Sequence, residues 1–169
     1  MKQVPEGTLV LLDEAYFEFA ADDPEYPDSM KYRFDNIISL RTFSKAYGLA
    51  GVRIGYGFAH ENLINNLMKV KLPFEPSGPA QAAAQAALGD DKFLKKSIEI
   101  ARNGREFFYD FLWGRDIPVI KSHDNFVTII FDSEKQVNHI YTQLLNRGLI
   151  LRRLAACVFD HCIRLAAEL

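Results

Sequence analysis

Apolar residues follow two periods along this chain, and each period predicts a different kind of element. Four consecutive apolar residues in "TLVLLDE" predict a buried strand over residues 8–14, of the kind found in a parallel sheet covered on both faces. Further short apolar runs predict strands over 36–44, 52–59, 117–122, 125–132, 149–154 and 161–166. Helical spacing or high helix propensity predicts helices over 60–71, 79–90, 91–113 and 133–148. The second of these should end at Gly89, and the fourth should be capped by Ser133. The inner face of the third should consist of Phe93, Ile98, Ala101, Phe108, Phe111 and Leu112. The glycines within 52–59 predict a close backbone approach. Because strands alternate with helices, the sequence predicts an α/β fold.

Prolines near the middle of the chain predict a boundary between two domains. Pro73 and Pro76 interrupt the segment "LPFEPSG" (72–78), where a helical pattern cannot continue. We therefore assign residues 1–72 to a first domain and residues 73–169 to a second, in which helices pack on short strands. Core strands lie close to both ends of the chain, which leads us to expect a part of a longer protein.

The composition is that of a globular protein and gives no sign of a highly charged partner. Hydrophobic residues make up 49% of the 169 residues, which is enough for a substantial core. The 20 basic and 22 acidic side chains nearly cancel, so we expect neither nucleic acid nor a membrane surface as a partner. No apolar run is as long as a membrane span, and two cysteines do not make a disulfide framework, which favours a cytoplasmic setting.

Acidic residues follow the first predicted strand directly, and three kinds of site would place them there. Apolar residues before Asp13 and Glu14 are typical of a Walker B segment, whose acids act on magnesium and water in a nucleotide hydrolase. That interpretation needs a phosphate loop, G-x-x-x-x-G-K-[ST], and the sequence contains none. A metal site of Asp13, Glu14 and Glu18 is the second possibility, although no histidine lies near them in sequence. An organic cofactor is the third.

The segment "RTFSKAYGLAGVRIGY" carries the groups that a phosphorylated aldehyde cofactor needs. Ser44 ends the predicted strand 36–44 and Lys45 follows it, at the edge where open α/β sheets bind ligands. A hydroxyl and the planar cation of Arg53 suit a phosphate dianion, and a lysine amine forms an imine with an aldehyde. Asp13 would then pair with a protonated pyridine nitrogen, and Tyr16 would hydrogen-bond the ring's phenolic oxygen. These residues together predict a pyridoxal-phosphate site.

The paired motifs "DEAY" and "SKAYGLAGVRIGY" resemble the fold-type-I pyridoxal-phosphate aminotransferases, and most of all the histidinol-phosphate aminotransferases. The resemblance covers essentially the whole chain and includes "NFVTIIF" and "GLILRRLAACVFDHCIRL". It implies that residues 1–72 are part of a mostly parallel-sheet large domain and that residues 73–169 are the α+β small domain. The implied enzyme is a homodimer that binds pyridoxal 5'-phosphate and transfers an amino group between histidinol phosphate and 2-oxoglutarate in histidine biosynthesis. The chain matches only the C-terminal half of that pattern, so we expect it to be inactive alone.

The resemblance also implies a role for each candidate residue. Lys45 would be the lysine that bonds to the cofactor and moves a proton at the α-carbon of the substrate. Asp13 would contact the pyridine nitrogen, and Tyr16 would contact the 3-hydroxyl. The cofactor phosphate would be held by Thr42, Ser44 and Arg53.

Two arginines are implied for the anionic end of the substrate, an amino phosphate or an amino acid. Arg164, in "CIRL", lies where the superfamily binds that end, and Arg152, in "ILRRL", lies where the histidinol-phosphate enzymes keep a second arginine. Two cations suit a phosphate dianion better than a single carboxylate. The chain departs from the family at Arg153, a position that is usually proline.

Other roles and other functions remain open at this point. The alternatives are a helix cap for Asp13, a surface position for Lys45, a core position for Tyr16 and a plain strand position for Thr42. For Arg53 and Arg164 the alternative is a structural ion pair, and for Arg152 it is a solvated position beside Arg153. Cys157, His161 and Cys162 lack the second ligand pair that a zinc site needs. An aromatic aminotransferase or a phospho-amino-acid decarboxylase would share the lysine motif. A nucleotide-hydrolase fragment or a non-catalytic fragment is the alternative of another class.

Overall fold

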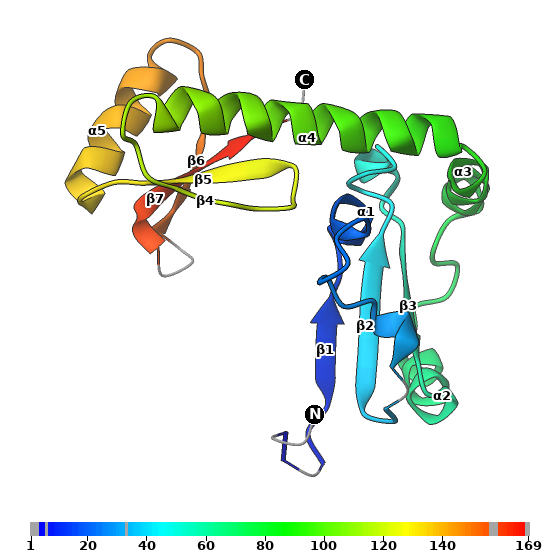
Figure 1. The fold of residues 1–169 in the computed structure, drawn as a ribbon. Coiled ribbons are helices and arrows are strands. Elements are labelled where there is room, and N and C mark those ends of the chain that lie inside the picture. The colour runs from blue at the N-terminus through cyan, green and yellow to red at the C-terminus, as the bar shows by residue number, and fades with distance from the viewer. Residues whose placement is uncertain (1–3, 6, 33, 156–158, 168–169) are drawn as a thin grey trace. The chain divides into compact units, whose positions relative to one another are not determined.

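The computed structural model describes residues 4–5, 7–32, 34–155 and 159–167, which form two compact units (Figure 1). The first unit is Met1–Lys95 and the second is Lys96–Leu169. Each unit contains a β-sheet together with helices, so the predicted α/β class is confirmed. The predicted boundary between residues 72 and 73 separates the large and small domains that the resemblance implies. It stays a prediction.

The first unit is built on a three-stranded sheet in the order β1-β2-β3. Its strands are β1 (Val10–Asp13), β2 (Ile37–Thr42) and β3 (Gly55–Ala59). β1 and β2 are parallel, as their arrowheads in Figure 1 show, and β3 runs antiparallel to β2. The register pairs Asp13 with Leu40 and Thr42 with Gly55. The ends of β1 and β2 and the start of β3 therefore lie at the same edge of the sheet.

Helices connect and follow these strands, and their caps explain where they begin. The helices are α1 (Phe17–Ala20), the 3₁₀ turns η1 (Ser29–Lys31) and η2 (Ala50–Val52), α2 (Glu61–Val70) and α3 (Gly78–Leu88). The Ser77 hydroxyl accepts a hydrogen bond from the Ala80 backbone N–H at 3.3 Å and so caps α3. Gly89 follows the last residue of α3, as the sequence predicted.

The long helix α4 (Asp91–Trp113) has the predicted bounds, begins in the first unit and continues into the second. Its buried residues are Ala101, Arg105, Tyr109 and Leu112, which lie on one face at helical spacing. The predicted inner face was right for Ala101 and Leu112 but wrong for Phe93 and Phe111, which are 48% and 45% exposed. A Cβ at Gly104 would lie 2.4 Å from the Ala167 carbonyl oxygen. This close backbone contact selects the buried face, and the spacing of large apolar residues does not reveal it.

The second unit is built on a four-stranded antiparallel sheet in the order β4-β5-β7-β6. Its strands are β4 (Val119–Ile120), β5 (Phe126–Ile130), β6 (Arg152–Leu154) and β7 (Phe159–Ala166), and its second helix is α5 (Glu134–Leu145). Ser133 caps α5 by accepting a hydrogen bond from the Gln136 backbone N–H at 3.3 Å, as predicted. The core of this unit includes Val127, Val137 and Ile163, which are each at most 1% exposed. Among the described residues, no helix combines the length and apolar character that crossing a bilayer requires.

Candidate active site

Six predicted residues form what we call the strand-end site: Asp13, Tyr16, Thr42, Ser44, Lys45 and Arg53. Asp13 is the last residue of β1, and Thr42 is the last residue of β2. Side chains alternate along a strand, so Thr42 shares a face with Leu40, and Leu40 is the register partner of Asp13. Asp13 and Thr42 therefore lie on one face at one edge, which is where open α/β sheets bind ligands.

Local hydrogen bonds fix the turns on which these residues lie. The Asp13 carboxylate accepts the Ala15 backbone N–H at 3.1 Å, and Thr42 Oγ1 accepts the Ser44 backbone N–H at 3.1 Å. The proposed helix cap at Asp13 is not formed, because α1 begins after Tyr16. The Asp13 bond uses one of several acceptor positions, so Asp13 keeps further hydrogen-bonding capacity. The Thr42 hydroxyl also donates to the Ile54 carbonyl at 3.5 Å, so Thr42 keeps one acceptor position.

Lys45 follows β2 and forms no ion pair with a described acidic residue. Its ammonium lies 5.3 Å from the centroid of the Tyr16 ring, and no ion pair or hydrogen bond of this ammonium occurs in the described residues. Lys45 and Tyr16 are both half-buried. An aromatic face favours a nearby cation, so this contact brings two predicted cofactor-binding residues together.

Arg53 has an unusual backbone conformation between η2 and β3. Its φ of 57° lies in the left-handed region, which costs a non-glycine residue about 1–2 kcal/mol. The Arg53 side chain is exposed and donates a hydrogen bond to the Ala50 carbonyl at 2.7 Å, and it forms no ion pair with any described residue. Strained residues cluster at functional sites, and this one lies at the edge where Thr42 pairs with Gly55.

Glycine at position 55 is required by the neighbouring strand. A Cβ at Gly55 would lie 2.7 Å from the Arg41 carbonyl oxygen, which is too close for any side chain. The glycines of β3 had predicted a close backbone approach, and for Gly55 the approaching group is β2 itself.

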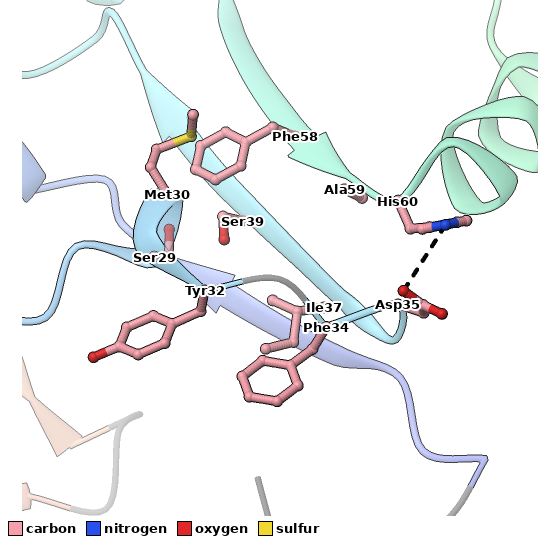
Figure 2. A pocket seen from close by; sticks show the side chains of 10 residues that line it. All are labelled: Ser29, Met30, Tyr32, Phe34, Asp35, Ile37, Ser39, Phe58, Ala59 and His60. Atoms are coloured by element: carbon pink, nitrogen blue, oxygen red, sulfur yellow. Dashed lines mark ion pairs between the residues drawn. The ribbon is translucent and has the colours of Figure 1, made fainter.

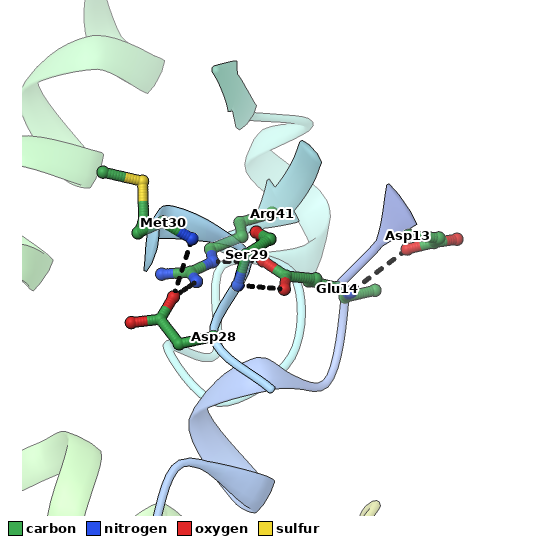
Figure 3. Close-up of polar contacts among 7 residues, drawn as sticks. Asp13, Glu14, Asp28, Ser29, Met30 and Arg41 are labelled. Carbon is green, nitrogen blue, oxygen red and sulfur yellow. Dashed lines mark hydrogen bonds and ion pairs between the residues drawn. The ribbon is translucent and has the colours of Figure 1, made fainter. Parts of the chain in front are cut away.

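The sequence reasoning missed a buried charge network on the opposite side of the strand ends (Figure 3). Arg41 Nε donates to Glu14 Oε2 at 2.9 Å, and Arg41 Nη2 donates to Asp28 Oδ1 at 2.9 Å. The hydroxyl of Ser29 donates to the same Glu14 oxygen at 2.7 Å. The Arg41 guanidinium also lies 3.4 Å from the centroid of the Phe17 ring. Glu14 and Arg41 adjoin Asp13 and Thr42 in sequence, so this network holds the two strand ends together.

A second group of predicted residues lies in the second unit and forms what we call the arginine pocket. Arg152 and Arg164 are register partners on β6 and β7, so their side chains share one face of the sheet. They line an open pocket of about 580 Å³ together with Tyr141, Ile150, Leu151, Arg153, Ala155 and Ala166. The Arg164 guanidinium lies 4.5 Å from the centroid of the Phe126 ring. No acidic residue is among the described residues that line this pocket.

Comparisons with known proteins agree with the motifs and with the fold. The model of the family "Aminotransferase class I and II" matches residues 2–168. The chain belongs to this aminotransferase family. Histidinol-phosphate aminotransferases of Caldicellulosiruptor saccharolyticus and of a Geobacillus strain are 43% identical over 154 residues and 41% identical over 167 residues. These alignments cover 90% and 98% of this chain but 42% and 45% of the relatives, so the chain spans less than half of their length.

The fold of this aminotransferase-family chain also matches a solved structure. The crystal structure of histidinol-phosphate aminotransferase from Sinorhizobium meliloti, in complex with pyridoxal-5'-phosphate, superposes with a TM-score of 0.89 at 32% identity. The match covers 99% of this chain and 46% of that one. The predicted resemblance and the predicted fold-type-I architecture are thereby confirmed.

One further acid of this aminotransferase-family chain lies close to the network of Arg41. Glu18, on α1, is 8% exposed, and its Oε2 has no hydrogen-bond partner among the described residues. Burial raises the pKa of Glu18, and the charge of Glu14 raises it further, whereas its own backbone N–H and Arg41 oppose the shift. Burial and the charge of Glu18 also raise the pKa of Tyr47. Because no sequence pattern marks an acid as unpaired, the structure alone identifies this group.

The pockets of the first unit hold few of the predicted residues. Figure 2 shows an apolar pocket lined by Met30, Tyr32 and Phe58, beside the ion pair of His60 with Asp35 at 3.8 Å, and it contains no strand-end residue. Asp13 lines a second open pocket, and a third contains Arg53; Lys45 lines none of the three. None of these three pockets of the described residues gathers the strand-end residues, and their roles in the family's chemistry stay predictions.

The metal alternatives gain no structural support in the described part of the family chain. No group of three or more His, Cys, Asp or Glu side chains there could hold a metal ion. Glu14 is occupied by Arg41 and Ser29. Cys162 is buried in the core at 1% exposure, and Cys157 lies outside the described residues.

Proposed function

We propose that this chain provides the lysine-bearing part of a pyridoxal-phosphate-dependent aminotransferase of histidine biosynthesis, acting on histidinol phosphate and 2-oxoglutarate. The observation that carries the proposal is the placement of Lys45, whose ammonium has no acidic partner in the described residues. It lies at the sheet edge that also carries Asp13 and Thr42. The relatives named histidinol-phosphate aminotransferases, at 41–43% identity, support the choice of reaction.

The donor set at the strand ends fits pyridoxal phosphate. A carboxylate (Asp13) suits a protonated ring nitrogen, and a tyrosine hydroxyl (Tyr16) suits a ring oxygen. The hydroxyls of Thr42 and Ser44 and the guanidinium of Arg53 suit a phosphate dianion. The left-handed backbone at Arg53 supports this assignment, because its strain is not offset by any ion pair of Arg53 in the described residues.

When bound, the cofactor supplies an aldehyde carbon for an amine and a ring that withdraws electrons. Lys45 would hold the cofactor and, once released as a neutral amine, would take the proton from the α-carbon of the bound substrate and return it to the carbon that the cofactor contributes. Asp13 would keep the ring nitrogen protonated by facing it with a negative charge. The network of Glu14 and Arg41 would hold the ends of β1 and β2 in register, and so would keep Asp13 and Thr42 in place.

The arginine pocket would bind the anionic end of the substrate. Two arginines directly opposite each other on neighbouring strands repel, and no described acid lines their pocket. A bound dianion would offset both charges, which favours a phosphate over a carboxylate. The proposal includes a 2-oxo acid as second substrate, a cytoplasmic homodimer as the working enzyme and inactivity of the isolated chain.

Chemical trapping tests the assignment of Lys45. The chain is combined with the upstream half that the family pattern implies, loaded with pyridoxal phosphate and reduced with borohydride, and the labelled peptide is mapped. We expect the label on Lys45. We also expect that Lys45→Ala abolishes labelling and amino transfer from histidinol phosphate while the far-ultraviolet circular dichroism spectrum is unchanged.

Lys69→Ala is the matched control, because Lys69 is an exposed lysine of the same unit whose Nζ contacts Asn66 at 2.8 Å. This variant should keep both the label and the turnover. A label on a lysine other than Lys45, or full turnover by Lys45→Ala, would contradict the proposed site.

A further inference from the structure

A third arginine takes part in the arginine pocket beside the two that the motifs identify. Arg153 is among the residues that line the same pocket as Arg152 and Arg164, and so is Tyr141, whose ring the Arg153 guanidinium contacts. None of the described residues that line it is acidic. Three cations around a space without an acid repel one another, and an anion that enters relieves this repulsion.

Arg153 reaches this pocket from the edge of the sheet and is held by α5. It pairs with Ile163, so it leaves β6 on the side opposite to Arg152 and Arg164. Its Nη1 donates to Asn138 Oδ1 at 2.5 Å, and its guanidinium lies 4.8 Å from the centroid of the Tyr141 ring. Both partners are neutral, so they orient the guanidinium without cancelling its charge.

The remaining donors of Arg153 are the reason to assign it a ligand. A guanidinium has five N–H donors in a fixed plane, and the bond to Asn138 uses one of them. Arg153 is exposed, and no carboxylate lies within ion-pair distance of it in the described residues. By contrast, Arg41 in the first unit has its charge balanced by two acids.

We propose that Arg153, oriented by Asn138 and Tyr141, is a specificity-determining residue that makes the arginine pocket select a doubly charged phosphomonoester over a singly charged carboxylate. The inference deepens the proposed function, on which it rests for the identity of the substrate. A third cation raises the affinity for a dianion more than for a monoanion, because each charge on the ligand interacts with it separately. Arg153 therefore sets the ratio of the two affinities.

Titrations of the 169-residue chain with methyl phosphate and with acetate test this, at pH about 8, where a phosphomonoester with a second pKa of about 6 is a dianion. Backbone amide shifts report both dissociation constants at matched ionic strength. Arg153→Gln should lower the affinity for methyl phosphate about threefold and the affinity for acetate much less, since an exposed charge contributes modestly to binding. Arg153→Lys keeps the charge and should retain most of the preference.

Arg147→Gln is the matched control, because it removes the same charge from an exposed arginine just after α5 that does not line the pocket. It should leave the ratio of the two affinities unchanged. An unchanged ratio in Arg153→Gln, or an equal fall in Arg147→Gln, would overturn the proposal. If Arg153 only stabilised α5, Arg153→Gln would weaken the binding of both anions equally. That result would also overturn the proposal. Because no cofactor is present, the outcome is independent of whether Lys45 bonds to pyridoxal phosphate.

Discussion

Arg41 in the first unit and Arg164 in the second carry the same cation in opposite electrostatic settings. Arg41 bonds to Glu14 and Asp28, and its side chain is 9% exposed. Arg164 contacts an aromatic ring and faces Arg152 across the strand pair, with no described acid in its pocket. A balanced cation holds structure together, whereas an unbalanced one is stabilised by a ligand. The comparison separates the two roles without reference to motifs.

Removing the balanced cation should have the largest effect. Arg41→Met leaves Glu14 buried without its partner, so we expect a loss of about 3–5 kcal/mol in the free energy of unfolding. Denaturant titration measures it. The double variant Glu14→Gln, Arg41→Met should lose clearly less than Arg41→Met alone, because no uncompensated charge remains. A loss below about 1 kcal/mol in the single variant would show that the network does not brace the strand ends.

Removing an unbalanced cation should affect binding far more than stability. Arg164→Gln should lower the affinity for methyl phosphate about tenfold, which corresponds to about 1.4 kcal/mol of binding free energy. It should shift the free energy of unfolding by less than about 1 kcal/mol. Relief of the repulsion from Arg152 offsets the lost contact with the ring of Phe126. Amide-shift titration and denaturant unfolding measure the two quantities. A large loss of stability with unchanged affinity would place Arg164 in the same class as Arg41.

Local patterns predicted most of the elements and the order of the site residues along the chain. The bounds of α4, the cap at Ser133 and the end of α3 at Gly89 follow from spacing and capping, which act over a few residues. The placement of Asp13 and Thr42 at one edge follows from the parallel pairing of two predicted strands. These features were predictable because each depends on neighbours in sequence or on a general rule of sheet geometry.

The sequence could not predict which charges would find partners. Asp28 lies 13 residues before Arg41 in a loop, and no local pattern distinguishes it from Asp22 or Asp23. The left-handed backbone at Arg53 depends on the turn formed by η2, and the tether of Arg153 to Asn138 spans 15 residues. Such pairings depend on tertiary geometry, so the structure supplied the distinction between balanced and unbalanced cations.

Glu18 extends the comparison to an acid that lacks a hydrogen-bond partner at Oε2 in the described residues. Burial raises its pKa above the ordinary value of 4.5, so the folded state holds the proton more tightly than the unfolded state. Its contribution to stability is therefore full below that value and is lost as the pH rises through the raised pKa.

Glu18→Gln removes this dependence on pH, because the amide stays neutral. We expect the variant to be more stable than the parent chain by about 1 kcal/mol at pH about 7, and equally stable at pH about 4. Denaturant unfolding at both pH values measures the difference. Greater stability of the parent chain at the higher pH would mean that the charged form of Glu18 is the favoured one, in the manner of Glu14.

The smallest expected effect concerns the helix that carries Asn138 and Tyr141. Ser133→Ala removes the cap of α5 and should cost about 0.5–1 kcal/mol of unfolding free energy, because the Gln136 backbone N–H loses its acceptor. Affinity for methyl phosphate should not change, since the cap lies at the first turn of α5 and lines no part of the arginine pocket. A fall in affinity equal to that of Arg153→Gln would mean that stability of the helix, and not the charge of Arg153, sets anion binding. That outcome would remove the distinction between an arginine that stabilises the fold and an arginine that binds an anionic ligand.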